Sequence, residues 1–166
     1  LGLICALIHT PQILFLDEPT TGVDPLSRRD FWLILYDLLK EGVTILFSTS
    51  YLDEAERCNR IGLIYQGDLL VADTPSAVKA RIGGTILELR MENLQKGMKL
   101  LEGLEVIRSL VLSGDKIHIL VDDPQKSEKV IRGILRKNGM EISDLVAVRP
   151  SLEDAFVSMV RERRRP

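Results

Sequence analysis

The sequence predicts an α/β protein: part of a parallel-sheet domain with a β-hairpin, followed by a small α+β domain. Apolar runs at residues 13–16 and 43–47 flank a stretch of helical periodicity, which is typical of a strand–helix–strand crossover in a parallel sheet. After Ile82-Gly83-Gly84, which has the composition of a linker, the pattern changes, so we predict domains over residues 1–84 and 85–166. The hydrophobic content of 45% with 28% charged residues is that of a globular chain.

Capping and stop signals define the first elements. Residues 1–9 have the spacing of a helix that ends at Thr10-Pro11, and Asp24-Pro25 combines an N-cap with a first-turn proline. The helix that follows should end at Gly42. Continuous apolar runs suit strands that are covered on both faces, so we expect both strands to be buried on both sides. The inward side of the helix is expected to carry Phe31, Ile34, Leu35, Leu38 and Leu39.

The remaining elements are predicted from alternation, turns and caps. In the first domain they are a helix at residues 52–58 with Ser50 as its N-cap, strands at 60–65 and 69–72 that form a hairpin, and a helix at 75–81. In the second they are a strand at 86–91, a partly helical stretch to 104, strands at 106–112 and 116–121, a helix opened by Asp123-Pro124, a strand at 142–148, and a helix opened by a capping box at 151–154. This second order, β-α-β-β-α-β-α, predicts a ferredoxin-like sheet with helices on one face.

Bulk properties exclude some classes of protein. The net charge of −2 gives no global sign of nucleic-acid binding. No apolar run approaches the ~20 residues that a membrane-crossing helix needs. Because the chain does not begin with Met and opens within a helical pattern, we expect it to be a piece of a longer protein.

Two carboxylates follow the first predicted strand directly. Sites in open α/β sheets lie at the carboxyl ends of strands, and Mg²⁺ usually takes one or two carboxylates with water and phosphate oxygens. Asp17 suits such an ion, often through a bound water, and Glu18 could orient and polarise an attacking water. An ordinary polar turn after a strand is an equally good interpretation of the dipeptide alone.

The following residues decide between these interpretations. Residues 16–25, Leu-Asp-Glu-Pro-Thr-Thr-Gly-Val-Asp-Pro, resemble the Walker B motif and D-loop of ABC-type ATPases. Residues 44–57 look like the strand and helix that flank the switch-histidine loop of that family, and residues 61–73 like its next hairpin. Thr10-Pro11-Gln12 matches the turn before Walker B, so the resemblance covers about residues 1–84 in unbroken order.

The resemblance implies a partial P-loop NTPase fold of the ABC type, with ATP and Mg²⁺ as cofactors. Asp17 would hold Mg²⁺, through a water, and contribute to the ATP site, and Glu18 would be the catalytic carboxylate. Asp24 would lie at the interface between two ATPase domains and help to couple their sites. Capping of the following helix is the simpler role for Asp24, and both roles can hold at once.

Two departures from the family pattern limit what the resemblance implies. Ser50 occupies the place of the switch histidine, and a serine cannot supply the cation-like contact to the γ-phosphate, so we expect a weakened catalytic position there. The chain also contains no G-x-x-x-x-G-K-[ST] phosphate loop and no Leu-Ser-Gly-Gly signature. We therefore expect this chain alone to bind ATP weakly or not at all, and to be inactive.

The second domain resembles the accessory domain that follows the ATPase in many ABC-2-type exporter subunits, through Pro-Ser-Leu-Glu-Asp-Ala-Phe at residues 150–156. His118 is expected to be structural, facing solvent or the sheet surface without convergent partners. His9 can meet the end of its helix. The basic residues 161–165 are interpreted first as a frayed, solvated terminus, and second as a contact with anionic lipid headgroups.

The preferred hypothesis is an ATP-binding and ATP-hydrolysing subunit of a multidrug-export-like ABC exporter. Its partners would be membrane permease subunits, docked near residues 26–40 or on the missing part, and a second ABC ATPase domain, with no nucleic acid. It would be cytoplasmic and peripheral on the inner face of the cell membrane. Two alternatives are a degenerate regulatory half with little or no turnover, which Ser50 favours, and a soluble ABC ATPase that acts on ribosomes or DNA.

Overall fold

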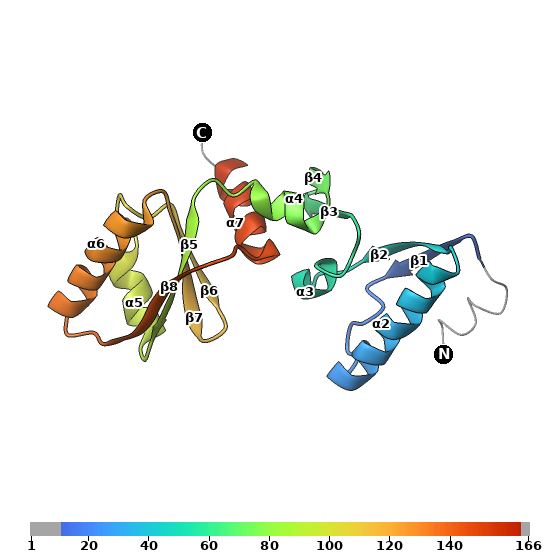
Figure 1. The fold of residues 1–166 in the computed structure, drawn as a ribbon, viewed down its shortest axis with the longest axis horizontal. Coiled ribbons are helices and arrows are strands. Elements are labelled where there is room, and N and C mark those ends of the chain that lie inside the picture. Colours follow the sequence, from blue (N-terminus) through green and yellow to red (C-terminus); the bar gives the residue numbers. More distant parts are fainter. Residues whose placement is uncertain (1–10, 164–166) are drawn as a thin grey trace. The chain divides into compact units, whose positions relative to one another are not determined.

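The computed structural model of the protein describes residues 11–163, and the chain divides after Ala55 into two compact units (Figure 1). The first unit contains β1 (Ile13–Asp17), α2 (Pro25–Lys40), β2 (Thr44–Ser48) and α3 (Leu52–Ala55). The second contains β3 (Ile61–Tyr65), β4 (Asp68–Asp73), α4 (Pro75–Ala80), β5 (Thr85–Met91), α5 (Leu94–Leu101), β6 (Ser109–Ser113), β7 (Lys116–Val121), α6 (Pro124–Lys137), β8 (Ile142–Val148) and α7 (Leu152–Arg163). The predictions for residues 1–9, His9 included, lie outside the described residues. This division describes how densely the residues pack and does not define domains, so the domains over 1–84 and 85–166 stay a prediction.

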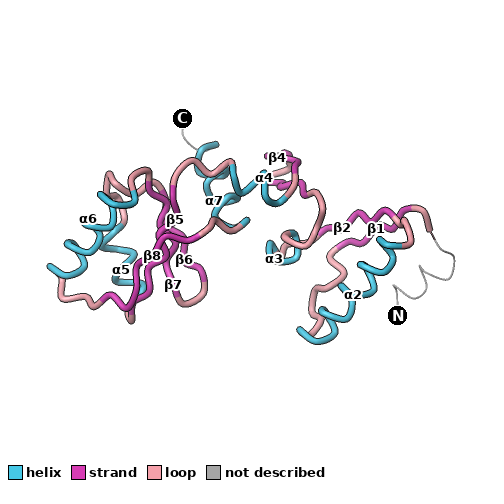
Figure 2. The backbone as a smooth tube through the Cα atoms, viewed as in Figure 1, coloured by secondary structure: helices cyan, strands magenta, loops and turns pink. Residues whose placement is uncertain are grey.

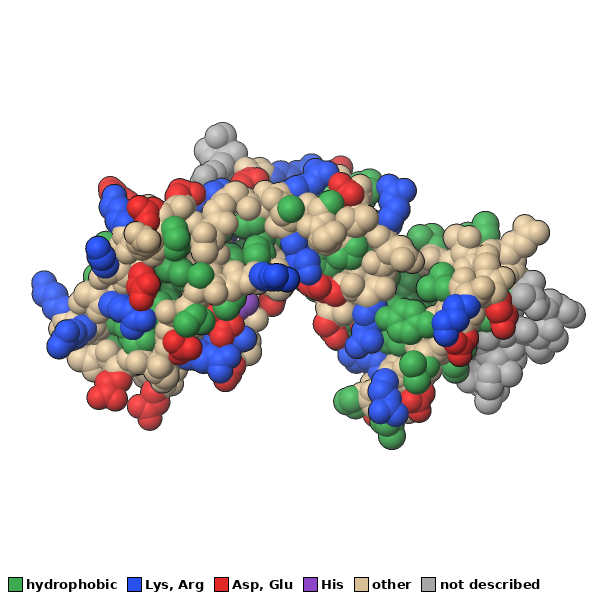
Figure 3. Space-filling model, in the orientation of Figure 1, with side chains coloured by type: hydrophobic (Ala, Val, Ile, Leu, Met, Phe, Trp, Pro, Cys, Tyr) green, Lys and Arg blue, Asp and Glu red, His purple; other side chains and the backbone are tan. Residues whose placement is uncertain are grey.

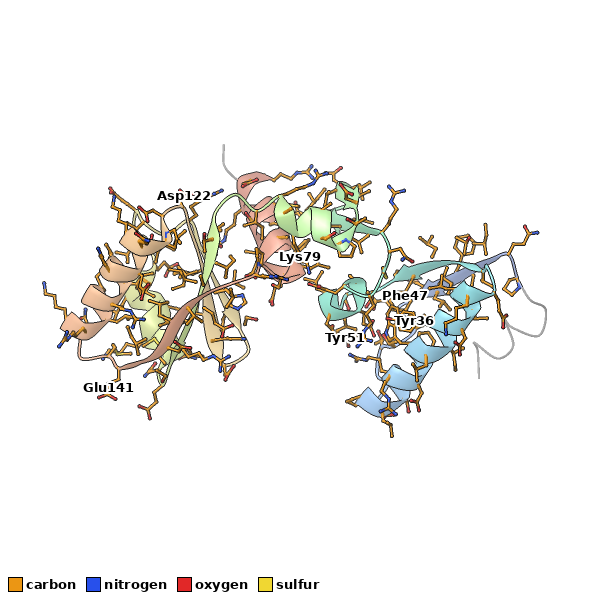
Figure 4. All side chains as sticks on the ribbon, in the orientation of Figure 1. Tyr36, Phe47, Tyr51, Lys79, Asp122 and Glu141 are labelled. Carbon is orange, nitrogen blue, oxygen red and sulfur yellow. The ribbon has the colours of Figure 1, made fainter. Side chains whose placement is uncertain are left out.

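The first unit is the predicted strand–helix–strand. β1 and β2 lie side by side and parallel in Figure 2, in a register that runs from Ile13 opposite Thr44 to Asp17 opposite Ser48. Aromatic side chains join α2 to β2, because the ring centroids of Trp32 and Phe47 are 5.0 Å apart. Tyr36 of α2 extends the cluster, because its ring centroid lies 5.9 Å from that of Trp32; Tyr36 and Phe47 are labelled in Figure 4.

The prediction that both strands are covered on two faces is wrong for the described residues. Phe15 is 70% exposed, and Ile13 and Leu46 are also exposed, because α2 packs on the opposite face of the strand pair. The predicted inward side of α2 is wrong in part as well. Trp32 and Leu35 are the buried residues of this helix, whereas Ile34 and Leu39 are exposed. The indole of Trp32 packs on Phe47 of β2, so the buried side of the helix is centred on Trp32 and Leu35.

The second unit begins with a tight antiparallel hairpin. β3 and β4 pair from Ile61 opposite Asp73 to Tyr65 opposite Asp68, which confirms the predicted hairpin. Its two turn residues, Gln66 and Gly67, both have positive φ angles, of 51° and 85°. This is the backbone combination that two-residue turns need to match the twist of the strands.

The main sheet of the second unit is antiparallel in the order β6-β7-β5-β8. Helices α5 and α6 pack on one face of this sheet, and α7 lies on the other (Figure 1). The core under α5 and α6 consists of buried aliphatic side chains: Leu87, Leu89, Met91, Leu101, Ile117, Ile119, Val121, Ile131, Leu135 and Leu145. The order of strands and helices agrees with the prediction, although α7 covers the second face and β6 begins at Ser109 rather than at 106. The chain before β6 turns through a hydrogen bond from the Ile107 amide to the Leu104 carbonyl.

The glycine pair at residues 83 and 84 is held against the sheet. Gly84 has a φ of +125°, and a Cβ on this residue would lie 2.6 Å from the carbonyl oxygen of Val121. The guanidinium of Arg108 donates to the Gly83 carbonyl. The pair, whose composition is that of a linker, therefore forms an ordered entry to β5.

Arginines of the two long C-terminal helices bind the edge strands of the sheet. Arg161 donates to the carbonyl of Leu110 in β6 at 3.1 Å, and Arg132 donates to the carbonyl of Leu145 in β8 at 3.3 Å. Arg163 also pairs with a carboxylate, that of Asp68. Residues 161–163 are exposed, but they continue α7 and make these contacts, so the prediction of a frayed terminus is wrong for them.

Charged side chains of both signs lie interspersed over the visible face of the second unit in Figure 3. Between residues 11 and 163, no helix combines the length and the apolar character needed to cross a membrane.

Candidate functional site

The carboxyl ends of β1 and β2 bring together residues that are far apart in sequence. In the parallel register Asp17 pairs with Ser48, and the Ser48 hydroxyl donates to the Asp17 carboxylate. The amide of Glu18 donates to the Ser48 hydroxyl at 3.0 Å and to the Ser48 carbonyl at 3.2 Å. Both Asp17 and Glu18 are exposed, so the carboxyl end of this strand pair presents two carboxylates to solvent.

Glu18 lies in a left-handed backbone conformation, with a φ of 45°. A non-glycine residue in this region costs energy, and such residues gather at functional sites. Its carboxylate oxygen Oε2 accepts from the hydroxyls of Thr21 at 3.3 Å and Ser50 at 3.4 Å. The structure thus places the two predicted catalytic positions, Glu18 and Ser50, in direct contact.

Ser50 does not have the structural role that the sequence suggested. Helix α3 begins at Leu52, so its N-cap position falls on Tyr51. The amides of Glu54 and Ala55 donate to the Tyr51 carbonyl. The prediction that Ser50 caps this helix is wrong, because its hydroxyl is oriented toward Glu18 instead.

Asp24 caps α2 as predicted. Its Oδ1 accepts from the amides of Leu26 and Ser27, both at 3.0 Å, and Pro25 occupies the first turn. Hydrogen bonds from Ser27, and then from the Leu26 amide, hold the pKa of Asp24 below its usual value. The predicted place of Asp24 between two ATPase domains stays a prediction.

A buried carboxylate behind the site was not predicted. Glu54 is 0% exposed, and its Oε2 accepts from the hydroxyls of Thr20 at 2.9 Å and Thr49 at 2.8 Å. Its other oxygen, Oε1, lies 3.6 Å from Nε of Arg28, whose guanidinium carbon is 4.7 Å from the ring centroid of Tyr51. No pattern in the sequence signals this role, because Glu54 stands among charged residues that look like a solvated helix face.

The second unit contains a buried charge cluster on the α7 side of its sheet. Nδ1 of His118 lies 2.9 Å from Oδ1 of Asp154, and its Nε2 lies 3.4 Å from Oε2 of Glu88. The expectation that His118 lacks convergent partners is wrong, because α7 places Asp154 over the strand. Asp154 also closes the predicted capping box, since its carboxylate accepts from the Ser151 amide and its amide donates to the Ser151 hydroxyl.

The cluster perturbs the titration of its three members. The hydrogen bond with Asp154 raises the pKa of His118 despite burial. Burial alone would raise the pKa of Asp154, but hydrogen bonds from His118 and Ser151 hold it below its usual value. The hydrogen bond from Lys116, with further ones from Arg90 and His118, lowers the pKa of Glu88 to about 2.

The oxygen atoms at the carboxyl ends of β1 and β2 fit a hard cation. Asp17 offers exposed carboxylate oxygens next to the Ser48 hydroxyl, and Mg²⁺ is usually held by one or two carboxylates with water and phosphate oxygens. Within residues 11–163 no three His, Cys, Asp or Glu side chains converge in a way that could hold a metal ion. A cation here would therefore depend on water and phosphate ligands in addition to Asp17.

Comparisons with known proteins identify the family of this chain. A family model described as "ATP-binding protein DrrA1-3-like, C-terminal domain" matches residues 74–160. The chain belongs to the DrrA1-3-like family of ATP-binding proteins. Members of this family form the C-terminal region of ABC-type exporter ATPases, as the motifs at residues 16–25 and 150–156 predicted.

Relatives of the DrrA1-3-like chain carry names of exporter ATP-binding proteins. It is 32% identical over 168 residues to the daunorubicin resistance ATP-binding protein DrrA2 of Streptomyces coeruleorubidus, covering 98% of this chain and 52% of the relative. It is 34% identical to the Nod factor export ATP-binding protein I of Rhizobium sp. strain N33, over 96% of this chain and 50% of the relative. The probable multidrug ABC transporter ATP-binding protein YbhF of Escherichia coli K12 is 54% identical over 49% of this chain and 14% of that protein. The chain thus spans about half the length, or less, of these relatives.

Proposed function

We propose that this chain is the C-terminal part of an ATP-hydrolysing subunit that powers export through a membrane permease. The observation that carries the proposal is the contact of Glu18 with Ser50 at the carboxyl ends of two parallel strands, next to Asp17. Phosphoryl transfer needs positioning and charge neutralisation more than covalent chemistry from the protein. Two exposed carboxylates held in fixed geometry at one strand edge suit that need.

The residues of this edge would divide the work. Asp17 would hold Mg²⁺ through a water, and the ion would neutralise charge on the phosphate oxygens of ATP. Glu18 would accept a hydrogen bond from the attacking water and polarise it, while Thr21 and Ser50 orient its carboxylate. The phosphate loop and signature would come from residues outside this chain, so the chain alone is proposed to bind ATP weakly and to turn none over.

The remaining proposals concern assembly. Asp24, at the exposed start of α2, would lie against a second ATPase domain, and the permease would dock near residues 26–40, where Leu26 and Leu33 are exposed. The protein would be peripheral on the cytoplasmic face of the membrane, with domains over 1–84 and 85–166. The antiparallel order β6-β7-β5-β8 supports a ferredoxin-like second domain. Co-purification with a polytopic membrane protein is the expected result, and co-purification with ribosomes or DNA would support the soluble alternative.

Substitution of Glu18 in the intact protein tests the catalytic proposal. We expect Glu18→Gln to lower ATP turnover by about a hundredfold or more, because the amide cannot act as a general base. Glu41→Gln, which removes an exposed charge at the end of α2, is the matched control and should leave turnover unchanged. Full turnover in Glu18→Gln would refute the assignment.

A second substitution tests the regulatory alternative, which the serine at position 50 favours. Ser50→His should raise turnover if the missing imidazole limits the reaction. If the intact wild-type protein binds ATP but turns none over, and Glu18→Gln and Ser50→His leave that unchanged, the protein is a regulatory half.

A further inference from the structure

We propose that Glu54 is a positioning residue that sets the spacing between Glu18 and Ser50, and this rests on the proposed ATPase function. The Glu54 side chain is 0% exposed, and the hydroxyls that donate to its carboxylate belong to Thr20 and Thr49. It acts on the site through Thr20, which follows Glu18 by two residues, and through Thr49, which precedes Ser50. The inference therefore concerns geometry transmitted from behind the site.

A single carboxylate oxygen joins the two loops. Oε2 of Glu54 accepts from Thr20 Oγ1 at 2.9 Å and from Thr49 Oγ1 at 2.8 Å. The loop after β1 and the loop after β2 are thus fastened to one atom on their buried side. On their exposed side the same two loops carry Glu18 and Ser50, 3.4 Å apart. A displacement of about 1 Å in a catalytic constellation can cost roughly a hundredfold in rate, so this fastening bears directly on activity.

The network continues behind the carboxylate. Oε1 of Glu54 pairs with Nε of Arg28 at 3.6 Å, and the Arg28 guanidinium lies over the Tyr51 ring. The Tyr51 amide donates to Thr49 Oγ1 at 3.0 Å, so the same hydroxyl that binds Glu54 also orders the start of α3. The Arg28 amide donates to the carbonyl of Asp24, which links the cluster to the beginning of α2.

Stability alone does not account for a carboxylate at this place. Glutamate is almost never fully buried unless it is paired, and replacing a buried ion pair by well-packed apolar residues is often neutral or stabilising. A buried charge that accepts from two loops at once instead favours one arrangement of those loops. The site served is identified by its neighbours in sequence, because both hydroxyls stand within two residues of the proposed catalytic positions.

The test uses Glu54→Gln in the intact protein, with Asp53→Asn as the matched control. The glutamine side chain would keep the volume of the glutamate but present an amide to Arg28 and remove the charge that both hydroxyls share. We expect kcat for ATP hydrolysis to fall about tenfold to a hundredfold while KM for ATP stays within about a factor of two. Asp53 is exposed on the same helix, and Asp53→Asn should leave both constants unchanged.

Hydrogen exchange supplies a readout that does not depend on activity. The amides of Thr21, Val23 and Tyr51 each donate a hydrogen bond within the two loops. In Glu54→Gln these amides should exchange about tenfold faster than in Asp53→Asn, because a neutral amide holds the two hydroxyls less strongly than a carboxylate, while amides within β1 and β2 keep their rates. Thr20→Val should reproduce the effect and should not add to it in the double variant.

The outcomes separate the two proposals. Unchanged kcat in Glu54→Gln beside an active wild type overturns the positioning role, and so does equal acceleration of exchange in the loops and in β1 and β2, since that indicates general destabilisation. If the wild-type protein hydrolyses no ATP, the proposed function fails. Faster exchange confined to the loops would then still support Glu54 as their fastening, and unchanged exchange would overturn it.

Discussion

Removal of the Asp154 carboxylate is the sharpest test of how the second unit holds together. Asp154 is 4% exposed and accepts from Nδ1 of His118 and from the amide and hydroxyl of Ser151. Asp154→Ala would leave His118 buried at 7% exposure beside Glu88, with the helix side of the ring unsatisfied. It would also remove one half of the capping box that opens α7.

The expected loss follows from these contacts. Breaking a buried ionic pair by removing one partner costs about 3–5 kcal/mol, and losing a helix cap costs about 1 kcal/mol. The two contributions overlap, since one carboxylate makes both sets of bonds, so we expect the free energy of unfolding of the second unit to fall by about 4 kcal/mol. Each 1.4 kcal/mol is a factor of ten, so the open population should rise by roughly three orders of magnitude.

Native-state hydrogen exchange measures this population at the amides of β5 and β7, which lie in the core of the second unit. In Asp154→Ala these amides should exchange about a thousandfold faster than in the wild type. Glu153→Ala is the matched control, because Glu153 is the exposed neighbour on the same turn and its loss should cost about 0.5 kcal/mol or less. Acceleration of less than about tenfold relative to that control would refute the reasoning.

Two further predictions concern the same unit. Because the pKa of His118 is raised in the folded state, protonated His118 stabilises the fold below about pH 6.5, and this contribution is lost as pH rises through the folded pKa. Because the pKa of Glu88 is lowered to about 2, ionised Glu88 stabilises the fold above about pH 4.5, and this contribution is lost as pH falls toward 2. The free energy of unfolding from urea titrations should therefore be highest between about pH 4.5 and 6.5, and a His118→Gln variant that keeps the same decline above pH 6.5 would contradict this. Gly84→Ala should destabilise the unit by about 2 kcal/mol or more, because its φ of +125° and a 2.6 Å approach to a β7 backbone oxygen disfavour a Cβ. Gly83→Ala is its control, with an ordinary 3.5 Å contact to a flexible guanidinium, and equal exchange rates in the two variants would count against this explanation.

Features encoded in short stretches of sequence were predicted well. Asp24 accepts from the amides of Leu26 and Ser27, Asp123 accepts from the amide of Lys126, and Ser151 and Asp154 each accept from the other's amide. Each of these caps is complete within four residues of sequence, and all three open helices in the structure. The parallel pairing of β1 with β2 followed from their apolar runs and the helix between them. The same pairing could have identified Ser48 as a partner of Asp17, because two parallel strands of equal length that start opposite each other also end opposite each other.

Features that depend on distant partners were missed. Glu54 is buried because Thr20, 34 residues earlier, donates to it, and nothing in the sequence distinguishes it from its exposed neighbour Asp53. His118 is buried because α7 returns over β7 and brings Asp154, 36 residues later, onto its ring. The inward side of α2 was misplaced because periodicity identifies an apolar stripe but not which part of that stripe a large indole such as Trp32 will occupy.

The arginine contacts at β6 and β8 bear on association between copies of the protein. An edge strand with unsatisfied carbonyls is a template on which another chain can add a strand, a common route to aggregation. Here one carbonyl on each edge strand, that of Leu110 and that of Leu145, already accepts from a long cationic side chain anchored on a helix. A strand arriving at either edge would have to displace a guanidinium and leave its charge without that partner. These two contacts therefore work against the addition of a strand at either edge of the sheet of the second unit.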